Sequence, residues 1–391
     1  MSVKLSNKFV AAGAAAAMAM SLAGCSGGSM DDSSDSGSSA ASGDTITIGS
    51  VTTNSGTAAA YGEAEVKGFE LAVSEINDKG GINGKKVKLE SMDDKGDATE
   101  ASNAFNKLAG DNNVLAVAGP TISATTAAVA PLADQSKLVA IAPAATSDSI
   151  ETGNYLFRTC FKDSYQGEVA ARFAAENLKV KKVAVLYGTG DPYSSGVGEA
   201  FAKAAEKLGL DVVAKESSSS ADDTEYSAQL QKIQASGAEF LYAPYYYSVA
   251  GPYIIPQARS VGFTGYVMGP DGYDGLKLVG DKAQYDKTFY TTHYSADDTS
   301  NSKVQDFIKS YKSKNNSDPN TFAALGYDTI YMLKQAIEKA GKNATREDVR
   351  NAVSGMSFDG VTGKFTLDKS GSPTKSVIVL ELKDGKPVYN T

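Results

Sequence analysis

Histidine, cysteine and tryptophan are scarce in this sequence, which has one histidine, two cysteines and no tryptophan in 391 residues. His293 is the single histidine, and the Gly-x-Ser-x-Gly pattern of a serine hydrolase does not occur. Gly84-Lys85 lacks the preceding glycine of a phosphate-binding loop, because position 79 is lysine. These absences argue against catalysis, so we expect no enzyme activity, no cofactor and no metal site.

Basic residues are outnumbered along the chain. There are 38 lysines and arginines against 46 aspartates and glutamates, which gives a formal net charge of −8. An acidic chain without a basic cluster is a poor partner for nucleic acid and for an anionic membrane surface. Long apolar runs are also missing after the first 24 residues, so we expect no spanning helix there.

The N-terminus is typical of an exported protein. Lys4 and Lys8 form a basic start, and residues 9–23 carry no charge before Gly24-Cys25. The segment resembles a bacterial lipoprotein signal, which implies cleavage before Cys25 and lipidation of that cysteine. The alternative is a membrane anchor, but the apolar run is short for the ~20 residues that a spanning helix needs. Residues 1–24 are therefore predicted to be a signal peptide.

Residues 25–43 follow as a tether of serine, glycine, alanine and three aspartates, with Met30 as the only large apolar side chain. Such a segment buries too little apolar surface to offset the entropy lost on ordering, so we expect a flexible linker. With Cys25 lipidated, Cys160 has no partner for an intramolecular disulfide. The folded body is predicted to lie outside the cytoplasm, held to the bacterial cell membrane by its lipid.

The remaining chain, about 350 residues, is too long for one ordinary core. Short β-branched runs alternate with longer amphipathic stretches, which predicts an α/β fold with parallel sheets. This alternation of strands and helices begins with a strand at residues 45–51 and a helix at 61–78, and it starts again at Lys182. Two similar halves predict two Rossmann-like lobes with a cleft between them. In such sheets, ligands bind in the loops that follow the carboxyl ends of the strands.

Two of those loops carry hydroxyl groups. Residues 119–126 follow one predicted strand, and residues 142–146 follow the next. Ser123 is expected at a helix N-terminus, where free backbone N–H groups and the helix dipole favour a carboxylate. Ser123 and Thr146 taken singly are also typical of simple helix caps. Because both loops end neighbouring strands, we favour a shared anion site.

Further motifs carry a resemblance to a known family. Those motifs are, in chain order, Thr53-Asn54-Ser55-Gly56, Tyr61-Gly62, Lys67-Gly68, residues 76–85, Asp93-Asp94, Pro143-Ala144-Ala145-Thr146, Arg158-Thr159, Gln166-Gly167, residues 257–262 and residues 268–272. They resemble the type I periplasmic binding proteins of the leucine/isoleucine/valine-binding family over about residues 44–385. This resemblance implies the type I periplasmic binding protein fold, in which a three-segment hinge joins the two lobes and the ligand lies in the cleft.

The resemblance also implies a set of ligand-binding residues. Ser123, Ala144 and Thr146 would hold the carboxylate and ammonium of a free amino acid, and Asp271 would pair with the ammonium. Tyr61 would line the apolar side, and Tyr193 would approach from the second lobe. Tyr246 is predicted from the run 245–247, although which of these three tyrosines faces the cleft stays open. Asp271-Gly272 is equally a common turn pair, in which the aspartate has no role.

By the same resemblance, residues 44–162 and 292–362 form lobe 1, and residues 163–291 and 363–391 form lobe 2. The implied function is that of an extracytoplasmic substrate-binding lipoprotein of an ABC importer, which captures leucine, isoleucine or valine and delivers it to a permease as a monomer. The alternatives are a ligand-binding sensor module and a binding protein for a related molecule, such as an amide, an aromatic acid or another amino acid.

Overall fold

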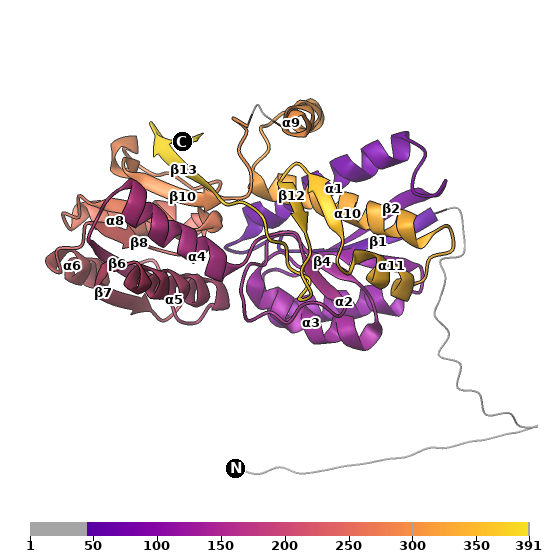
Figure 1. Ribbon diagram of the computed structural model, residues 1–391, viewed down its shortest axis with the longest axis horizontal. Helices are drawn as coiled ribbons and strands as arrows, with labels where there is room; N and C mark the ends of the chain where they lie inside the picture. Colours follow the sequence, from indigo (N-terminus) through magenta and orange to yellow (C-terminus); the bar gives the residue numbers. More distant parts are fainter. Residues whose placement is uncertain (1–44, 299–300, 390–391) are drawn as a thin grey trace, which may run out of the picture. The chain divides into compact units, whose positions relative to one another are not determined.

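The computed structural model describes residues 45–298 and 301–389 (Figure 1). The predicted signal peptide, the lipidated Cys25 and the linker to residue 43 lie outside the described residues. No helix of the two described ranges combines the length and the apolar character that crossing a bilayer requires.

The first sheet has five parallel strands within the described chain, in the order β2-β1-β3-β4-β5. These strands are β1 (Thr45–Thr52), β2 (Lys86–Asp93), β3 (Val114–Ala118), β4 (Ala140–Ala142) and β5 (Leu156–Arg158). The helices that connect them are α1 (Ala59–Asp78), α2 (Ala98–Gly110) and α3 (Ser123–Ser136). All five residues of β3 are buried, as expected for a strand covered on both faces.

The second sheet has seven strands among the described residues, in the order β14-β13-β10-β9-β8-β6-β7. The strands are β6 (Lys182–Gly188), β7 (Asp211–Ser218), β8 (Phe240–Tyr242), β9 (Tyr266–Gly269), β10 (Thr288–Thr292), β13 (Ile378–Lys383) and β14 (Lys386–Tyr389). Its helical elements are α4 (Asp163–Arg172), η1 (Phe173–Asn177), α5 (Pro192–Lys207), α6 (Ser227–Ala235), α7 (Tyr247–Val249), η2 (Ala250–Ile254), α8 (Ile255–Ser260), η3 (Asp271–Tyr273) and η4 (Lys282–Tyr285). Strand β13 pairs antiparallel with β10, whereas β6 to β10 run parallel.

The chain then returns to the first sheet. The elements of this part are α9 (Ser302–Asn315), α10 (Thr321–Ala340), α11 (Arg346–Val353), β11 (Ser357–Gly360) and β12 (Gly363–Thr366). In Figure 1, α10 and α11 lie beside the elements of the first sheet. Helix α10 packs closely on α1, since a Cβ added at Gly68 would lie 2.2 Å from the carbonyl oxygen of Ala323. The prediction of an α/β fold with two sheets is thus confirmed.

We propose that the final crossing between the sheets lies later in the chain than Gly363, where it was predicted. Strand β12 pairs with β11, and Phe365 and Leu367 share one apolar cluster with Phe69 of the first half. The chain joins the second sheet only at Ile378, the first residue of β13. The β-hairpin holds its aromatic residues in the first core, and we therefore propose a third crossing between residues 368 and 377. The other lobe limits remain as predicted above.

Candidate functional site

Loops from both sheets enclose a small cavity of about 10 Å³. It is lined by Tyr61, Thr121, Ile122, Ser123, Ala144, Tyr193, Tyr246, Asp271, Gly272 and Phe322. Six of the seven ligand-binding residues predicted from the sequence therefore meet around one space, and Thr146 is the exception. The lining residues follow the carboxyl ends of strands or begin helices, as expected for ligand sites in parallel sheets.

The start of α3 forms one wall of the cavity. Ile122 occupies the N-cap position without a side-chain cap, and Ser123 is the first helical residue. The Ser123 hydroxyl accepts a hydrogen bond from the Ser147 backbone N–H at 3.2 Å, so it ties the two strand-end loops together. The interpretation of Ser123 as a simple helix cap is therefore wrong. The first N–H groups of a helix lack intrahelical partners, and this wall therefore suits an anion.

Thr146 lies behind this wall. Its side chain is fully buried, and its hydroxyl interacts with the Asp163 carboxyl, where it opposes the rise in the pKa of that acid. Its carbonyl oxygen accepts the backbone N–H of Asp163 at 2.9 Å, which joins the loop to the start of α4. Thr146 thus supports the wall from behind and does not line the cavity.

Asp271 is the acidic group of the cavity, and it is 2% exposed. Its Oδ1 accepts hydrogen bonds from the Tyr193 hydroxyl at 2.8 Å and from Gln166 Nε2 at 3.1 Å. Its Oδ2 lies 3.3 Å from His293 Nε2. The backbone N–H of Asp271 also donates to Gln166 Oε1 at 3.2 Å. This carboxylate is held in a fixed orientation and is not the exposed turn acid that Asp-Gly pairs commonly supply.

No cation of the described chain neutralises Asp271. Burial lowers the pKa of His293 to about 4, so this contact partner is uncharged at neutral pH. The neighbouring Asp163 is itself an acid, and burial together with the charge of Asp271 raises its pKa. Within residues 45–298 and 301–389, no lysine or arginine forms an ion pair with Asp271. A buried carboxylate in this setting is stabilised by a cationic ligand.

Aromatic rings form the remaining walls. Tyr61 stacks on Phe322 with ring centroids 3.9 Å apart, and Tyr193 stacks on Tyr246 at 5.4 Å. Tyr245 is directed elsewhere, because its hydroxyl lies 2.8 Å from that of Ser218 and its ring meets Tyr226 edge-on. The sequence left open which of the three consecutive tyrosines faces the cleft, and in the structure Tyr246 lines the cavity.

Several residues of this site were not identified from the sequence. Thr121, Ile122 and Gly272 lie in loops that were recognised, but no periodicity singles them out. Phe322 begins α10 and is about fifty residues beyond Asp271, so only the return of the chain brings it to the cavity. Glu65 is fully buried and accepts the Thr121 hydroxyl at 2.6 Å, and burial raises the pKa of this glutamate.

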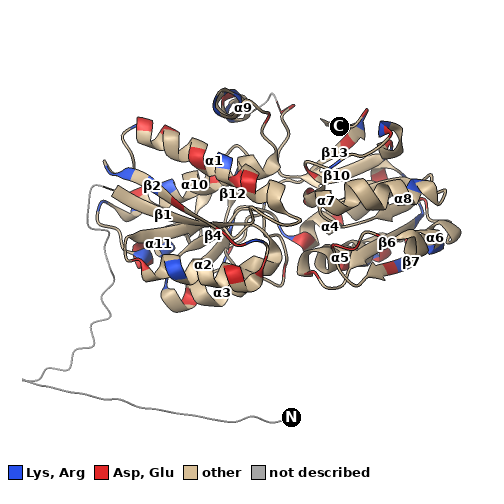
Figure 2. Cartoon of the chain, turned by 180° about the vertical axis from the view of Figure 1, so that it is seen from behind, with Lys and Arg blue, Asp and Glu red and all other residues tan. Residues whose placement is uncertain are grey.

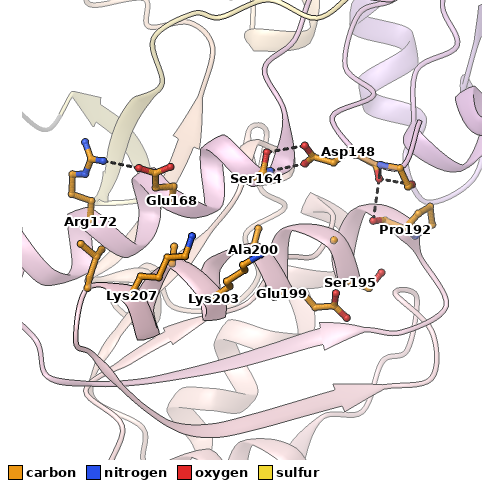
Figure 3. A pocket seen from close by; sticks show the side chains of 15 residues that line it. Asp148, Ser164, Glu168, Arg172, Pro192, Ser195, Glu199, Ala200, Lys203 and Lys207 are labelled. Carbon is orange, nitrogen blue, oxygen red and sulfur yellow. Dashed lines mark hydrogen bonds and ion pairs between the residues drawn. The ribbon is translucent and has the colours of Figure 1, made fainter. Parts of the chain in front are cut away.

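A larger groove of about 860 Å³ lies between α4, α5 and residues 147–149 (Figure 3). Three of its charged side chains have partners nearby, since Arg172 contacts Glu168 at 2.7 Å and Asp148 accepts both the N–H and the hydroxyl of Ser164. Elsewhere on the chain, basic and acidic side chains are interspersed (Figure 2). The groove lacks buried, convergent polar groups, so the smaller cavity is the better candidate site.

Two open α/β sheets whose strand-end loops enclose one small cavity define a two-lobed binding protein. The chain belongs to the periplasmic binding protein family, whose model matches residues 45–387, and within it to the type I leucine/isoleucine/valine-binding proteins. A Leu/Ile/Val-binding protein homologue of Brucella melitensis is 31% identical over 350 residues, which cover 88% of this chain and 93% of that protein. The leucine-, isoleucine-, valine-, threonine- and alanine-binding protein of Pseudomonas aeruginosa is 29% identical and covers 84% of this chain and 87% of its own length.

Solved structures agree with this assignment. The branched-chain amino acid substrate-binding protein LivJ of Streptococcus pneumoniae, in complex with isoleucine, is 32% identical with a TM-score of 0.81, over 88% of this chain and 97% of that one. The leucine-binding protein LivK of Thermotoga maritima is 31% identical with a TM-score of 0.82, over 88% and 98%. A solute-binding protein from R. palustris in complex with benzoate, 23% identical with a TM-score of 0.77 over 88% and 95%, shares the fold.

Proposed function

We propose that this chain is the extracytoplasmic substrate-binding protein of an ABC importer, and that it captures free leucine, isoleucine or valine. The observation that carries this proposal is the position of Asp271, a buried carboxylate without a cationic partner in the described chain, in the same cavity as the N-terminus of α3. A free amino acid presents one cation and one anion, which match these two features.

The expected binding mode follows from the walls of the cavity. The ligand carboxylate faces the first N–H groups of α3 and the Ser123 hydroxyl, where the helix dipole favours negative charge. The ligand ammonium faces Asp271 and the backbone of Ala144. An aliphatic side chain then packs among Tyr61, Tyr246 and Phe322, whose rings supply apolar surface.

The N-terminal segment completes this proposal. Residues 1–24 act as the signal peptide, Cys25 receives the lipid, and residues 25–43 link it to the binding domain. The protein works as a monomer that is anchored to the cell membrane through this lipid and that delivers its ligand to a separate permease. The name of LivJ, a branched-chain amino acid transporter substrate-binding protein, supports the partnership with a permease.

We propose binding without catalysis and without a cofactor. The polar groups at the cavity are hydroxyls, phenols and one carboxylate that three side chains already hold in place. Burial raises the pKa of the nearby Cys160 thiol to about 12, so this cysteine is not a thiolate nucleophile at neutral pH.

An aromatic acid is the second candidate ligand. The close stacking of Tyr61 on Phe322 suits a flat ring, and the benzoate-binding relative has the same fold. An aromatic acid has no ammonium, however, and would place a carboxylate near an acidic cavity. Asp271 therefore favours the amino acid.

A calorimetric and thermal-shift panel tests the proposal. Leucine, isoleucine and valine are compared with 4-methylpentanoate, which lacks the ammonium, and with benzoate. We expect the amino acids to stabilise the fold, by about 2.7 kcal/mol at a concentration one hundred times Kd. Stabilisation by benzoate or 4-methylpentanoate without any by the amino acids would contradict the assignment.

A further inference from the structure

His293 is the one ring nitrogen donor at the acidic group of the cavity, and it lies outside the cavity itself. It follows β10, and its side chain is fully buried. Nε2 lies 3.3 Å from Asp271 Oδ2, whereas the two other donors to this carboxylate, Tyr193 and Gln166, both bond Oδ1. His293 is therefore the only side chain of the described residues that is hydrogen-bonded to Oδ2.

The environment of the imidazole fixes its tautomer. Nδ1 is buried and has no hydrogen-bond partner among the described residues, and the ring stacks on Phe161 with centroids 3.5 Å apart. A proton on Nδ1 would be a buried donor without an acceptor, which is costly. The proton of a neutral ring is therefore on Nε2, where it donates to Asp271.

The imidazole also faces a second charged group. Asp271 attracts a proton to the ring, whereas burial and the positive charge of Lys375 oppose protonation, and the pKa of His293 falls to about 4. The neutral ring thus orients the carboxylate without cancelling its charge. A lysine or a protonated histidine at this position would pair with Asp271 and compete with a ligand cation.

These contacts also connect the cavity to the segments that join the two sheets. Phe161 lies between β5 and α4, where the chain first passes from one sheet to the other, and His293 follows β10, where it returns. Lys375 lies in the stretch before β13 and donates to the carbonyl oxygen of Thr159 at 3.3 Å. The first and the last crossing segments therefore each have one side chain near the imidazole of the second: Phe161 stacks on it, and the charge of Lys375 acts on it.

We infer that His293 is a positioning residue for Asp271: its Nε2–H fixes the carboxylate toward the ligand ammonium, and its stacking on Phe161 ties that carboxylate to the first crossing segment. This inference rests on the proposed function, since it names a residue that supports ammonium recognition in the same cavity. His293 itself does not contact the ligand. It acts on the ammonium of the amino acid through Asp271.

Two substitutions of His293 test separately the contribution of its N–H donor and that of its aromatic ring. His293→Gln keeps an N–H near the position of Nε2 and loses the aromatic ring, whereas His293→Phe keeps a ring against Phe161 and loses the donor. We expect His293→Phe to weaken leucine binding by roughly tenfold to a hundredfold, the range for a lost hydrogen bond to a charged group. His293→Gln should remain within about threefold of the wild type, because it conserves that hydrogen bond.

Calorimetry with leucine and 4-methylpentanoate, at equal folded fractions, measures both effects. Unchanged leucine affinity in His293→Phe would overturn the inference, and so would an equal loss in both variants, which would reduce the histidine to a packing residue. A loss that is the same for 4-methylpentanoate as for leucine would also overturn it, because the former has no ammonium. If the wild type binds no amino acid at all, the proposed function fails instead.

Nuclear magnetic resonance of the untagged wild type provides a readout that does not depend on any variant. The sequence contains one histidine, so its imidazole signals belong to His293. We expect the Nε2–H tautomer, and we expect saturating leucine to lower the pKa of His293 further, because the ligand ammonium offsets the charge of Asp271. By linkage, leucine binding weakens as the pH falls toward 4 and the ring becomes protonated. Imidazole signals that leucine does not move would overturn the inference.

Discussion

At the scale of single residues, the proposed recognition of the ligand depends most on Asp271, the acidic residue that lines the cavity. A buried carboxylate is tolerated when donors satisfy it, and Tyr193, Gln166 and His293 supply three hydrogen bonds that leave its charge intact. No lysine or arginine of the described chain pairs with Asp271, so the carboxylate can pair with a cationic ligand. Tyr193 also accepts the backbone N–H of Gly272 at 2.8 Å, so one phenol orients both the acid and its turn.

The first prediction at this scale concerns Asp271→Asn. The amide keeps the size of the side chain but removes its charge, so leucine binding should weaken by on the order of 2–5 kcal/mol, the range for removing one member of a buried charged pair. Calorimetry measures this loss. The unfolding temperature of the free protein should change little.

Asp274→Asn is the matched control for this substitution. Asp274 is a half-buried acid three residues away, and it accepts the Thr321 backbone N–H at 2.7 Å without lining the cavity. Its substitution should leave the leucine affinity near that of the wild type. Equal affinities of Asp271→Asn and the wild type would reduce Asp271 to a turn residue.

At the scale of elements, the start of α1 and the short helix α7 join the two halves beside the cavity. The Tyr247 hydroxyl accepts the Ala60 backbone N–H at 3.2 Å, and the Tyr247 backbone N–H donates to the Tyr61 hydroxyl at 3.0 Å. The Ser248 hydroxyl donates to the carbonyl oxygen of Thr57 at 2.7 Å. These contacts involve residues about 190 positions apart, so they form only when the two elements meet.

The second prediction concerns these contacts. The double substitution Tyr247→Phe with Ser248→Ala removes two side-chain hydrogen bonds and no cavity-lining residue. At about 1 kcal/mol each, we expect leucine to dissociate roughly tenfold faster or more, with a small change in the association rate. Stopped-flow measurement of both rates checks this. Tyr165→Phe, at a 40% exposed tyrosine of α4, is the control, and an unaltered dissociation rate in the double variant would contradict the prediction.

The periodic elements could be predicted from the sequence, whereas the short and polar ones could not. Helix α1 shows apolar residues at helical spacing followed by Gly80-Gly81, and its predicted range 61–78 differs from the structure by two residues. Strand β5 has only three residues, and α4 begins with polar side chains that give no apolar period. Helix α11 is mostly charged and is recognised by its capping box at Thr345 and Asp348, a signal that we did not use.

A site residue could be predicted from the sequence only where a side chain that suits the ligand lies in a loop that follows a strand. Ser123 and Asp271 stand directly after strands, so the rule for parallel sheets identifies their loops. Phe322 and His293 come from elements that only the return of the chain brings together, and a sequence pattern does not encode this packing. Thr146 was predicted for the right loop but points behind the wall, since a loop's position does not fix the direction of each side chain.

At the scale of the whole molecule, the connections between the sheets limit how the two halves can move. We propose three crossings, near residues 159–163, 292–295 and 368–377, and buried polar contacts hold them together. Lys375 donates to Thr159 and to the Thr362 hydroxyl, at 3.3 and 2.7 Å, and burial lowers its pKa to about 8. Three short segments permit hinge bending while they prevent free rotation of one half against the other.

A ligand held by both halves stabilises their closed arrangement only through its stronger binding to that arrangement. Ser123 belongs to the first half, whereas Tyr193 and Asp271 belong to the second. We therefore expect the α3 wall to govern initial capture, and Tyr193 and Asp271 to govern closure. Small-angle scattering of the wild type should give a smaller radius of gyration with saturating leucine than without it.

The third prediction separates capture from closure through Tyr193→Ala. This variant removes the phenol that bonds both Asp271 and the Gly272 N–H, but it leaves the α3 wall intact. We expect leucine to bind weakly and the ligand-dependent compaction to disappear. Tyr165→Ala, at the exposed tyrosine of α4, should compact like the wild type. Because Tyr193 is 5% exposed and Tyr165 is 40% exposed, the unfolding temperature of each variant is measured as well, so that a loss of stability is distinguished from a loss of closure. Identical radii of the free and the saturated wild type would rule out closure as the mechanism of capture.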